Sequence, residues 1–472
     1  MQRLPRLTWS ALLAFAFVVP ALAAQPAADV SHLPARPAPK WLTEGVMYQI
    51  WLRSFTPEGT LAAAAARLPQ LADLGVTVLY MPPVQLSDPD MRQEFWSKRQ
   101  KASGTNNPRN PYRISDYNQI DPEYGTDADL RQFVQAAHKL GMRVLLDLVY
   151  FHCGPTSPLL ARPDFVKRDA SGKVSTGNWN FPVLNFECQG LREHLWANME
   201  HWVKNFDVDG FRCDVADSVP LDFWEEGRVR VEKIKPDIAI LAEGERRCAN
   251  QLKAFDISYG FSWRSVTQAV FTSGKPASSL REHWEATRAK HPQGARFLRY
   301  TENHDIVNDM FRAEVVSGER GAAVLTAINF TLDGMPLIYN GQEIGDTSPQ
   351  SIYADWPVGW QIACLPKCAA KLEVHKTLCR LRRGEPALHS GEVVWLDNDQ
   401  PESVVSFLRR AGKDEIITLA NLSSRPVSVT VKLPEGGTTV YRNLVTAKPD
   451  KITAGQDKPV PLANFDYFVG KR

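Results

Sequence analysis

Four short stretches of the chain combine acidic residues with basic partners, and they follow one another in a fixed order. They are Asp147–His152, Gly210–Asp214, Ala242–Gly244 and Glu302–Asp305. Three of them place a carboxylate just after an apolar run typical of a β-strand, which is where barrel enzymes hold their reacting groups. A single acid after a strand is a common loop start. Four in series, with two His and one Arg beside the acids, indicate an enzyme site rather than solvated surface.

The overall composition excludes some classes of partner. The chain has 472 residues, of which 44% are hydrophobic and 23% charged, as in a soluble globular protein with one large core and a smaller unit. Its formal net charge is only +2, and Lys and Arg are scattered among acids. We therefore expect no nucleic-acid or other polyanionic partner.

The N-terminal segment has the pattern of an export signal. Arginines precede an apolar run from Leu12 to Val19, and Ala21–Ala23 supplies small residues for cleavage. We predict a removed signal peptide at residues 1–24, although an uncleaved membrane anchor is the alternative, and an unstructured Pro- and Ala-rich linker at 25–40. The protein is then secreted or periplasmic, without membrane contact after signal removal.

Seven cysteines in an exported chain allow up to three disulfides with one thiol left over. The plausible pairs are Cys153 with Cys188, and Cys364 with Cys368. Cys213 lies on a predicted strand and faces the packed helices, which favours a buried free thiol. No Cys/His spacing resembles a zinc site, so we predict no metal among the site residues.

Apolar periodicity predicts strands alternating with helices along most of the chain. Such alternation predicts a parallel sheet, and eight units at this length favour an α/β fold of the closed (β/α)8 TIM-barrel type over an open sheet. The barrel is predicted at residues 41–390. Its predicted strands are 46–51, 76–80, 143–148, 208–212, 238–241, 255–257, 297–300 and 336–339.

Two connections are too long to be simple turns, and the end of the chain has a different pattern. The stretches 84–125 and 153–190 are candidates for walls of a binding cleft, the second forming an insertion domain at about 151–190 after the third strand. Beyond the barrel, short β-runs follow one another without helices. They predict a C-terminal all-β sandwich domain at 391–472.

Together with Tyr112–Tyr117, Asp121–Thr126 and Gly334–Glu343, the four acidic stretches resemble motifs of the α-amylase family, glycoside hydrolase family 13. The resemblance covers nearly everything after the linker. Asp214–Asp217 is nearer to the cyclomaltodextrinase and neopullulanase-like branch. The extra N-terminal domain often seen in that branch is missing, so a dimer built with it is not expected and we predict a monomer.

The resemblance implies a retaining glycosidase with three catalytic acids. Asp214 is implied as the nucleophile and Glu243 as the general acid and base, on opposite sides of the scissile bond and roughly 5 Å apart. Asp305 is implied as the third carboxylate, which holds substrate hydroxyls. We expect other acids nearby to keep Glu243 partly protonated near neutral pH.

Five further residues are implied as substrate-binding. Tyr112 resembles the aromatic platform under the sugar, and His152 and His304 resemble its hydrogen-bond donors. Arg212 projects to the same side of its strand as Asp214, so its charge should keep Asp214 ionised. Asp147 is implied as an acid that orients the site, although a helix cap or an ion pair is the simpler interpretation of that residue alone.

The resemblance implies no cofactor for the chemistry. Many members carry an Asn before the His of the first stretch, and that Asn commonly ligates a structural Ca²⁺. This chain has Phe151 at that position, which offers no oxygen, so we do not expect that calcium site.

The expected function is cleavage of α-1,4-glucosidic bonds in starch, maltooligosaccharides or cyclodextrins by double displacement. Its partner is then an α-glucan or maltooligosaccharide substrate. One alternative is an α-glucan transglycosylase or a trehalose-forming isomerase, because both use the same covalent intermediate. The other is a non-catalytic carbohydrate-binding or partner protein, although inactive relatives usually lack one or more of the acids that this chain retains.

Overall fold

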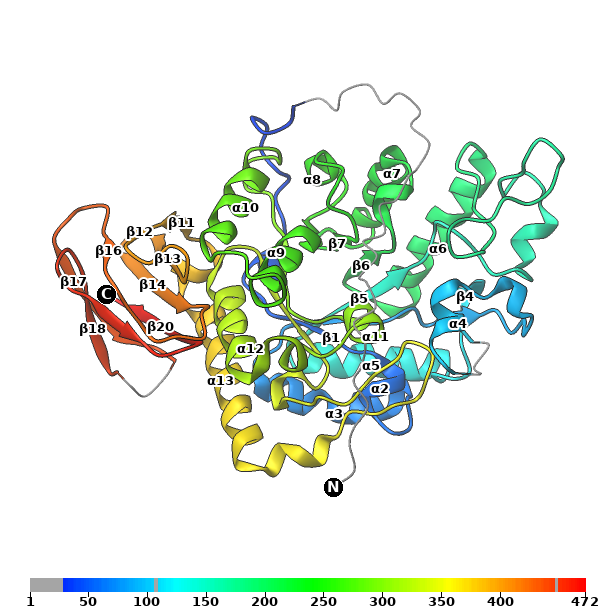
Figure 1. Cartoon of the computed structure of the whole chain (residues 1–472). Helices are drawn as coiled ribbons and strands as arrows, with labels where there is room; N and C mark the ends of the chain where they lie inside the picture. The colour runs from blue at the N-terminus through cyan, green and yellow to red at the C-terminus, as the bar shows by residue number, and fades with distance from the viewer. Residues whose placement is uncertain (1–28, 106–108, 446–448) are drawn as a thin grey trace.

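Eight parallel strands form a closed barrel in the computed structural model, which describes residues 29–105, 109–445 and 449–472 (Figure 1). In the sheet the neighbours follow the order β8-β7-β6-β5-β2-β1-β10-β9, and a parallel bridge between Ser258 and Phe297 joins the two ends. The barrel predicted from the alternating pattern is therefore confirmed. Its strands are β1 (Met47–Gln49), β2 (Val78–Tyr80), β5 (Arg143–Leu148), β6 (Gly210–Cys213), β7 (Ala239–Ala242), β8 (Ile257–Ser258), β9 (Leu298–Arg299) and β10 (Met335–Tyr339).

Helices cover the outside of the barrel, and local sequence signals set their ends. Thr126 caps the first turn of α5 in a capping box with Asp129, and Gly75 ends α3 with a φ of 96° that favours glycine. The longer helices are α3 (Leu61–Leu74), α5 (Asp127–Lys139), α6 (Gln189–Phe206), α7 (Leu221–Glu232), α9 (Phe261–Thr272), α10 (Ser278–Arg288), α12 (Ala313–Thr331, broken at Gly318) and α13 (Pro366–Gly384). The short ones are α1 (Lys40–Thr43), α2 (Leu52–Phe55), α4 (Lys98–Ala102), α8 (Asn250–Lys253), α11 (His304–Asp309) and α14 (Pro386–His389).

The two long connections build structure beside the carboxyl ends of the strands. The stretch 84–125 contains α4 and the antiparallel pair β3 (Gln85–Ser87) and β4 (Ile114–Ile120). The stretch 153–190 is held by isolated bridges such as His152 with Val183 and Val166 with Leu184. Both lie on the side of the barrel away from the C-terminal strands (Figure 1).

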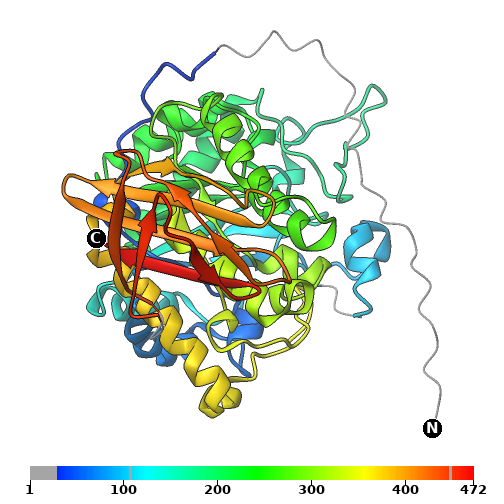
Figure 2. The same ribbon diagram turned by 60° about the vertical axis from the view of Figure 1, so that its left-hand side comes forward.

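The C-terminal part is all-β, as predicted, and its strands pair in antiparallel sheets. Its six-stranded sheet packs beside α12 and α13 (Figure 2), and Val405 and Phe407 of the sheet share an apolar cluster with Trp263 of α9 and Leu325 of α12. The sheet contains β11 (Glu392–Trp395), β13 (Val404–Ala411), β14 (Asp414–Asn421), β17 (Thr438–Asn443), β18 (Lys451–Gly455) and β20 (Asp466–Lys471). Two small pairs join β12 (Asp397–Asn398) to β16 (Val431–Lys432) and β15 (Val427–Val429) to β19 (Val460–Leu462).

The N-terminal segment differs from its prediction where the structure describes it. The predicted signal peptide, 1–24, and residues 25–28 of the predicted linker lie outside the described residues. The remainder of the linker is not a free spacer. The Ala35 and Arg36 backbone N–H groups donate to the carbonyls of Gln293 and Gln251, and the Arg36 side chain pairs with Glu232 and Asp256. No helix among the described residues has the length and apolarity that a membrane span requires.

The disulfide predictions are wrong for this structure, in which all seven cysteines are free. Cys153 is completely buried, whereas the Cys188 thiol donates to Asp164 Oδ2 at 3.1 Å. Cys364 is exposed, and its thiol donates to the Gln361 carbonyl at 3.1 Å. Sequence spacing could not show which way these thiols point. Cys213 is a buried free thiol, as expected.

Candidate active site

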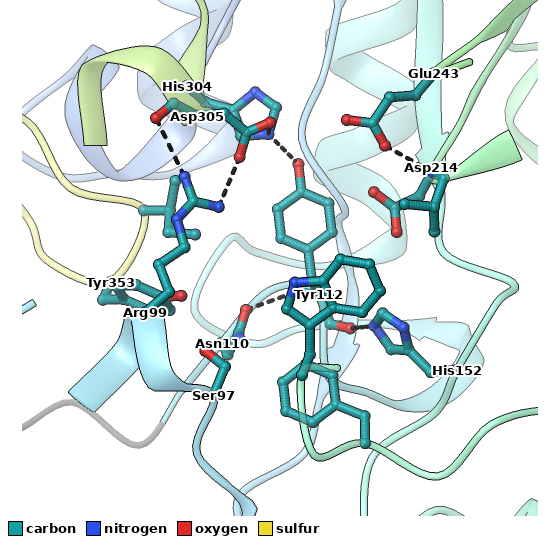
Figure 3. A pocket seen from close by; sticks show the side chains of 14 residues that line it. Ser97, Arg99, Asn110, Tyr112, His152, Asp214, Glu243, His304, Asp305 and Tyr353 are labelled. Carbon is teal, nitrogen blue, oxygen red and sulfur yellow. Dashed lines mark hydrogen bonds and ion pairs between the residues drawn. The ribbon is translucent and has the colours of Figure 1, made fainter. Parts of the chain in front are cut away.

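The three predicted acids meet in one pocket at the carboxyl ends of the barrel strands (Figure 3). Asp214 directly follows β6, Glu243 directly follows β7, and Asp305 lies in the first turn of α11 after β9. Because parallel strands of a barrel end on one face, acids far apart in the sequence converge there. Tyr112, His152 and His304 line the same pocket.

Arg212 connects the acids from beneath the pocket floor. It lies on β6 two residues before Asp214, so both side chains project to the same side. Arg212 Nη1 donates to Asp214 Oδ1 at 2.7 Å and to both oxygens of Asp147 at 2.7 and 2.8 Å. Arg212 Nη2 lies 2.6 Å from Glu243 Oε1. One fully buried guanidinium therefore holds Asp214 and Glu243 side by side, an arrangement compatible with the roughly 5 Å separation of a retaining pair.

Burial and charge give the two acids different protonation states near neutral pH. Burial raises the pKa of Asp214 to about 6, and the Arg212 charge limits this rise. Burial raises the pKa of Glu243 to about 8 despite Arg212, and the nearby Asp214 and Asp305 add to the rise. At pH 7 Asp214 is therefore mostly ionised and Glu243 mostly protonated. These are the states that a nucleophile and an acid require.

Val215, between the two acids, has a backbone conformation that β-branched residues rarely adopt. Its φ of 38° and ψ of 45° lie in the left-handed region. The Val215 N–H donates to Glu243 Oε2 at 2.7 Å. Strain of this kind costs about 1–3 kcal/mol and persists where the surroundings impose it. Here it accompanies a hydrogen bond that orients the acid.

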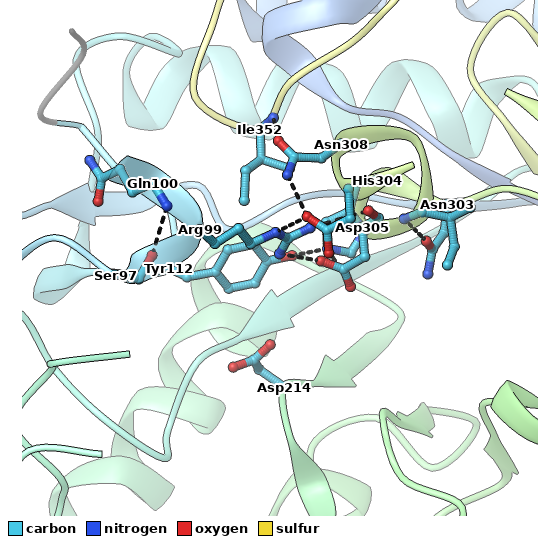
Figure 4. Close-up of polar contacts among 12 residues, drawn as sticks. Ser97, Arg99, Gln100, Tyr112, Asp214, Asn303, His304, Asp305, Asn308 and Ile352 are labelled. Carbon is cyan, nitrogen blue, oxygen red and sulfur yellow. Dashed lines mark hydrogen bonds and ion pairs between the residues drawn. The ribbon is translucent and has the colours of Figure 1, made fainter. Parts of the chain in front are cut away.

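Asp305 is held by an arginine that the sequence motifs do not contain. Arg99 of α4 donates through Nη1 to Asp305 Oδ1 at 2.7 Å and through Nη2 to the Asp305 carbonyl at 3.2 Å, and it also pairs with Asp309 (Figure 4). Burial alone would raise the pKa of Asp305, but charges at His304, Arg99 and Arg212 lower it well below its usual range. Because burial lowers the pKa of His304 to about 3, His304 is neutral at pH 7. The lasting positive charges that keep Asp305 ionised are those of Arg99 and Arg212.

A hydrogen-bonded chain fixes the His304 ring. Gln49 Nε2 lies 2.6 Å from His304 Nδ1, so the amide donates there and the ring proton lies on Nε2. His304 Nε2 lies 2.6 Å from the Tyr112 hydroxyl, which donates in turn to Asp147 Oδ2 at 3.2 Å. Trp51 stacks on the ring with centroids 5.0 Å apart. Two residues missed by the sequence analysis, Gln49 and Trp51, therefore position a predicted one.

His152 lies at the pocket wall next to the insertion. Its Nε2 donates to the Tyr112 carbonyl at 2.9 Å, and its Nδ1 makes no hydrogen bond to any described residue. Burial lowers the pKa of His152 to about 4, so the ring is neutral at pH 7. In this structure the ring proton of His152 is used on the Tyr112 carbonyl and its Nδ1 is buried, so the role of sugar hydrogen-bond donor stays a prediction.

Two of the residues predicted to bind substrate lie behind the pocket. The Asp147 and Arg212 side chains are completely buried and support the acids and Tyr112 from below. Asp147 contacts Tyr112 and Arg212, and the orienting role that the resemblance implies for it stays a prediction. The pocket also contains residues that the sequence analysis did not assign to it: Ser97, Arg99, Asn110, Trp179, Phe181, Val215, Ile352 and Tyr353. Most come from the long excursions, where no motif marks them.

The position of the family's common calcium ligand does not fit a cation here. Phe151 packs edge-on against Trp179, with centroids 6.1 Å apart, and contributes no oxygen. Within the described ranges no group of three or more His, Cys, Asp or Glu side chains is arranged to hold a metal ion. The expectation of no metal stays a prediction.

Comparison with known proteins agrees with this geometry. The family model of the alpha-amylase catalytic domain matches residues 37–162 and 175–416. An alpha-amylase of Haloarcula japonica is 28% identical over 91% of this chain and 62% of its own length, so the chain spans less than two thirds of that relative. Neopullulanase 2 of Thermoactinomyces vulgaris is 25% identical over 89% of this chain and 76% of its own length. The structure of a maltogenic alpha-amylase from Thermotoga neapolitana superposes with a TM-score of 0.80 at 24% identity, covering 91% of this chain and 99% of its own. The chain therefore belongs to the alpha-amylase family of glycoside hydrolases.

Proposed function

We propose that the protein is a retaining α-glycoside hydrolase that cleaves α-1,4-glucosidic bonds. The observation that carries the proposal is the pair Asp214 and Glu243, held on the two terminal nitrogens of the Arg212 guanidinium. At pH 7 Asp214, with a pKa of about 6, is mostly ionised, and Glu243, with a pKa of about 8, is mostly protonated. Double displacement needs such a pair of carboxyl groups.

In the first step an Asp214 oxygen attacks the anomeric carbon while the bond to the leaving oxygen breaks. Arg212 occupies Asp214 Oδ1, and among the described residues nothing hydrogen-bonds Oδ2, so Oδ2 is the attacking oxygen. The Glu243 proton passes to the leaving oxygen. In the second step the Glu243 carboxylate takes a proton from water, and the water oxygen displaces Asp214 from the anomeric carbon with net retention.

The substrate proposal extends to starch, maltooligosaccharides and cyclodextrins. It draws on relatives whose names are alpha-amylase and neopullulanase and on a pocket that contains Tyr112, Trp179 and several polar groups. We further propose a secreted or periplasmic monomer that needs no cofactor. The export signal pattern at 1–24 supports export, and Phe151 at the calcium-ligand position supports the absence of a cofactor, whereas the monomer rests on the resemblance alone.

The test compares the mature wild-type protein with Asp214→Asn on maltoheptaose, following reducing sugar and products. We expect the wild type to release shorter maltooligosaccharides or glucose, and the variant to lose several orders of magnitude in rate. Products longer than maltoheptaose would instead identify a transglycosylase, and a non-reducing disaccharide from maltose an isomerase. No turnover of maltoheptaose, cyclodextrin or maltose by the wild type would contradict the proposal.

A further inference from the structure

The pocket has two ends that differ chemically. Glu243 must face the leaving group, because it protonates the departing oxygen. In a glucosyl ring C1 and C4 are on opposite sides, so the 4-hydroxyl of the ring being cleaved points away from Glu243. That hydroxyl is also where a longer substrate would carry its next sugar toward the non-reducing end. In Figure 3 the side chains opposite Glu243 are Arg99 and Tyr353.

Arg99 is fixed in that position by one face of α11. It hydrogen-bonds the Asp305 carboxylate and carbonyl, and it pairs with Asp309, one turn further along the same helix. The Arg99 side chain is only 25% exposed. Arg99 is therefore a wall of the pocket and not a freely moving surface side chain.

The neighbouring loop is attached to the same helix. Asn308 Oδ1 accepts from the Ile352 backbone N–H at 3.0 Å and from the Ser351 hydroxyl at 3.2 Å (Figure 4). This places Ile352 and Tyr353 beside α4, and both line the pocket together with Ser97 and Arg99. Two segments from different parts of the chain thus meet at the end of the pocket opposite Glu243.

From these contacts we propose that Arg99 closes the pocket beyond the cleaved ring, so that the enzyme removes one glucosyl unit at a time from non-reducing ends. The proposal rests on the proposed function and narrows its substrates to α-glucosides with a free non-reducing end, so that cyclodextrins, which have no chain end, are left out. Arg99 directly contacts the carboxylate assigned to the hydroxyls of the cleaved ring, and it lines the end of the pocket toward which the 4-hydroxyl points, where the next sugar would be attached. Interior bonds of long chains and the bonds of cyclodextrins cannot then reach Asp214.

The first experiment measures the earliest products and the dependence on a free chain end. Wild type is given maltoheptaose, β-cyclodextrin, p-nitrophenyl maltoheptaoside and the same aryl glycoside blocked at its non-reducing end by a 4,6-ethylidene group. We expect glucose as the first product, with the blocked and cyclic substrates at least 100-fold slower than their open counterparts. Maltose or longer products from the start, or blocked and open substrates cleaved at similar rates, would overturn the proposal.

The second experiment separates a wall from a purely electrostatic partner of Asp305. In Arg99→Ala we expect the ratio of kcat/KM for the blocked over the open substrate to rise at least 10-fold, even though both values fall. If Arg99 only kept Asp305 ionised, its removal would lower both kcat/KM values equally and leave their ratio unchanged. Arg92→Ala is the matched control, since Arg92 lies in the same excursion, is 59% exposed and pairs with Asp90. Its ratio should equal that of the wild type.

The outcomes distinguish this inference from the proposed function. If wild type cleaves none of these substrates, the hydrolase proposal itself fails. If it cleaves maltoheptaose at interior bonds, the hydrolase proposal stands and only the role of Arg99 fails.

Discussion

At the scale of single residues, Arg212 determines how the neighbouring acids behave. Its fully buried guanidinium contacts Asp147, Asp214 and Glu243 at 2.6–2.8 Å. Arg212 offsets only one of the negative charges of its three carboxyl partners, so keeping Glu243 protonated limits the net charge of this buried group to −1 when Asp147 and Asp214 are ionised. The planar fork of arginine is required to reach partners on both terminal nitrogens.

Arg212→Lys should therefore lower kcat/KM by at least about 100-fold, because an ammonium cannot hold Asp214 and Glu243 in two fixed directions. The measurement is steady-state hydrolysis of maltoheptaose by purified, folded protein. Arg228→Lys is a suitable control, since Arg228 is also buried and pairs with Asp256, away from the pocket. An Arg212→Lys rate close to that of the control would show that only the charge matters.

The pKa values of the acid pair predict a bell-shaped pH dependence of kcat/KM. The rate should rise as Asp214 ionises near pH 6 and fall as Glu243 loses its proton near pH 8. These two limbs belong to the coupled group of acids rather than to single residues. With an aryl glucoside whose leaving group needs no proton, Glu243→Gln should lose the falling limb. A falling limb that persists in this variant would assign it to another residue.

At the scale of secondary structure, the turns after the strands hold the reacting acids. Among the residues of these turns, Val215 has the most unusual backbone conformation. Val215 directly follows Asp214, has left-handed backbone angles, and donates its N–H to the Glu243 carboxyl. Only glycine adopts such angles without steric cost.

Val215→Gly should change the free energy of unfolding by less than about 1 kcal/mol, because relief of strain offsets the lost side chain. Val219→Gly provides the comparison, since Val219 is buried at an ordinary φ of −98°. That change should cost at least about 2 kcal/mol through lost packing and chain entropy. Urea unfolding of both variants checks this, and equal destabilisation would mean that Val215 is not strained.

The same scale shows what the sequence could and could not predict. The strands and the acids that follow them were predictable, since apolar runs mark buried strands and a barrel gathers their carboxyl ends on one face. Arg99 was not, because its place depends on how a long excursion folds over α11. The direction of the His152 proton and the orientation of Cys153 and Cys188 depend on packing around each side chain. No local pattern encodes them.

At the scale of the whole molecule, the acids with raised pKa values contribute less to the free energy of unfolding as the pH rises. The raised pKa of Glu243, about 8, and those of Asp147 and Asp214, about 6, mean that the folded state holds more protons than the unfolded state between about pH 4 and 8. Each contribution is fully present below the unfolded pKa and is lost as the pH rises through the folded pKa. Buried neutral histidines such as His152 and His304 act in the opposite direction as pH falls below about 6.

Glu243→Gln isolates one of these contributions, because glutamine imitates the protonated acid at every pH. The Tm difference, variant minus wild type, should therefore increase from pH 5 to pH 8. Differential scanning calorimetry at several pH values measures it. A constant difference across this range would contradict the raised pKa of Glu243.

The central claim is that Asp214 forms a covalent glycosyl intermediate, and trapping that intermediate tests it most directly. The mature protein would be incubated with 5-fluoro-α-glucosyl fluoride, digested and analysed by mass spectrometry. We predict one added fluoroglucosyl group on the peptide that contains Asp214, and none in Asp214→Asn. A label on another carboxylate would contradict the assignment of the nucleophile, and turnover of the reagent with no labelled peptide at any time would contradict the double-displacement account.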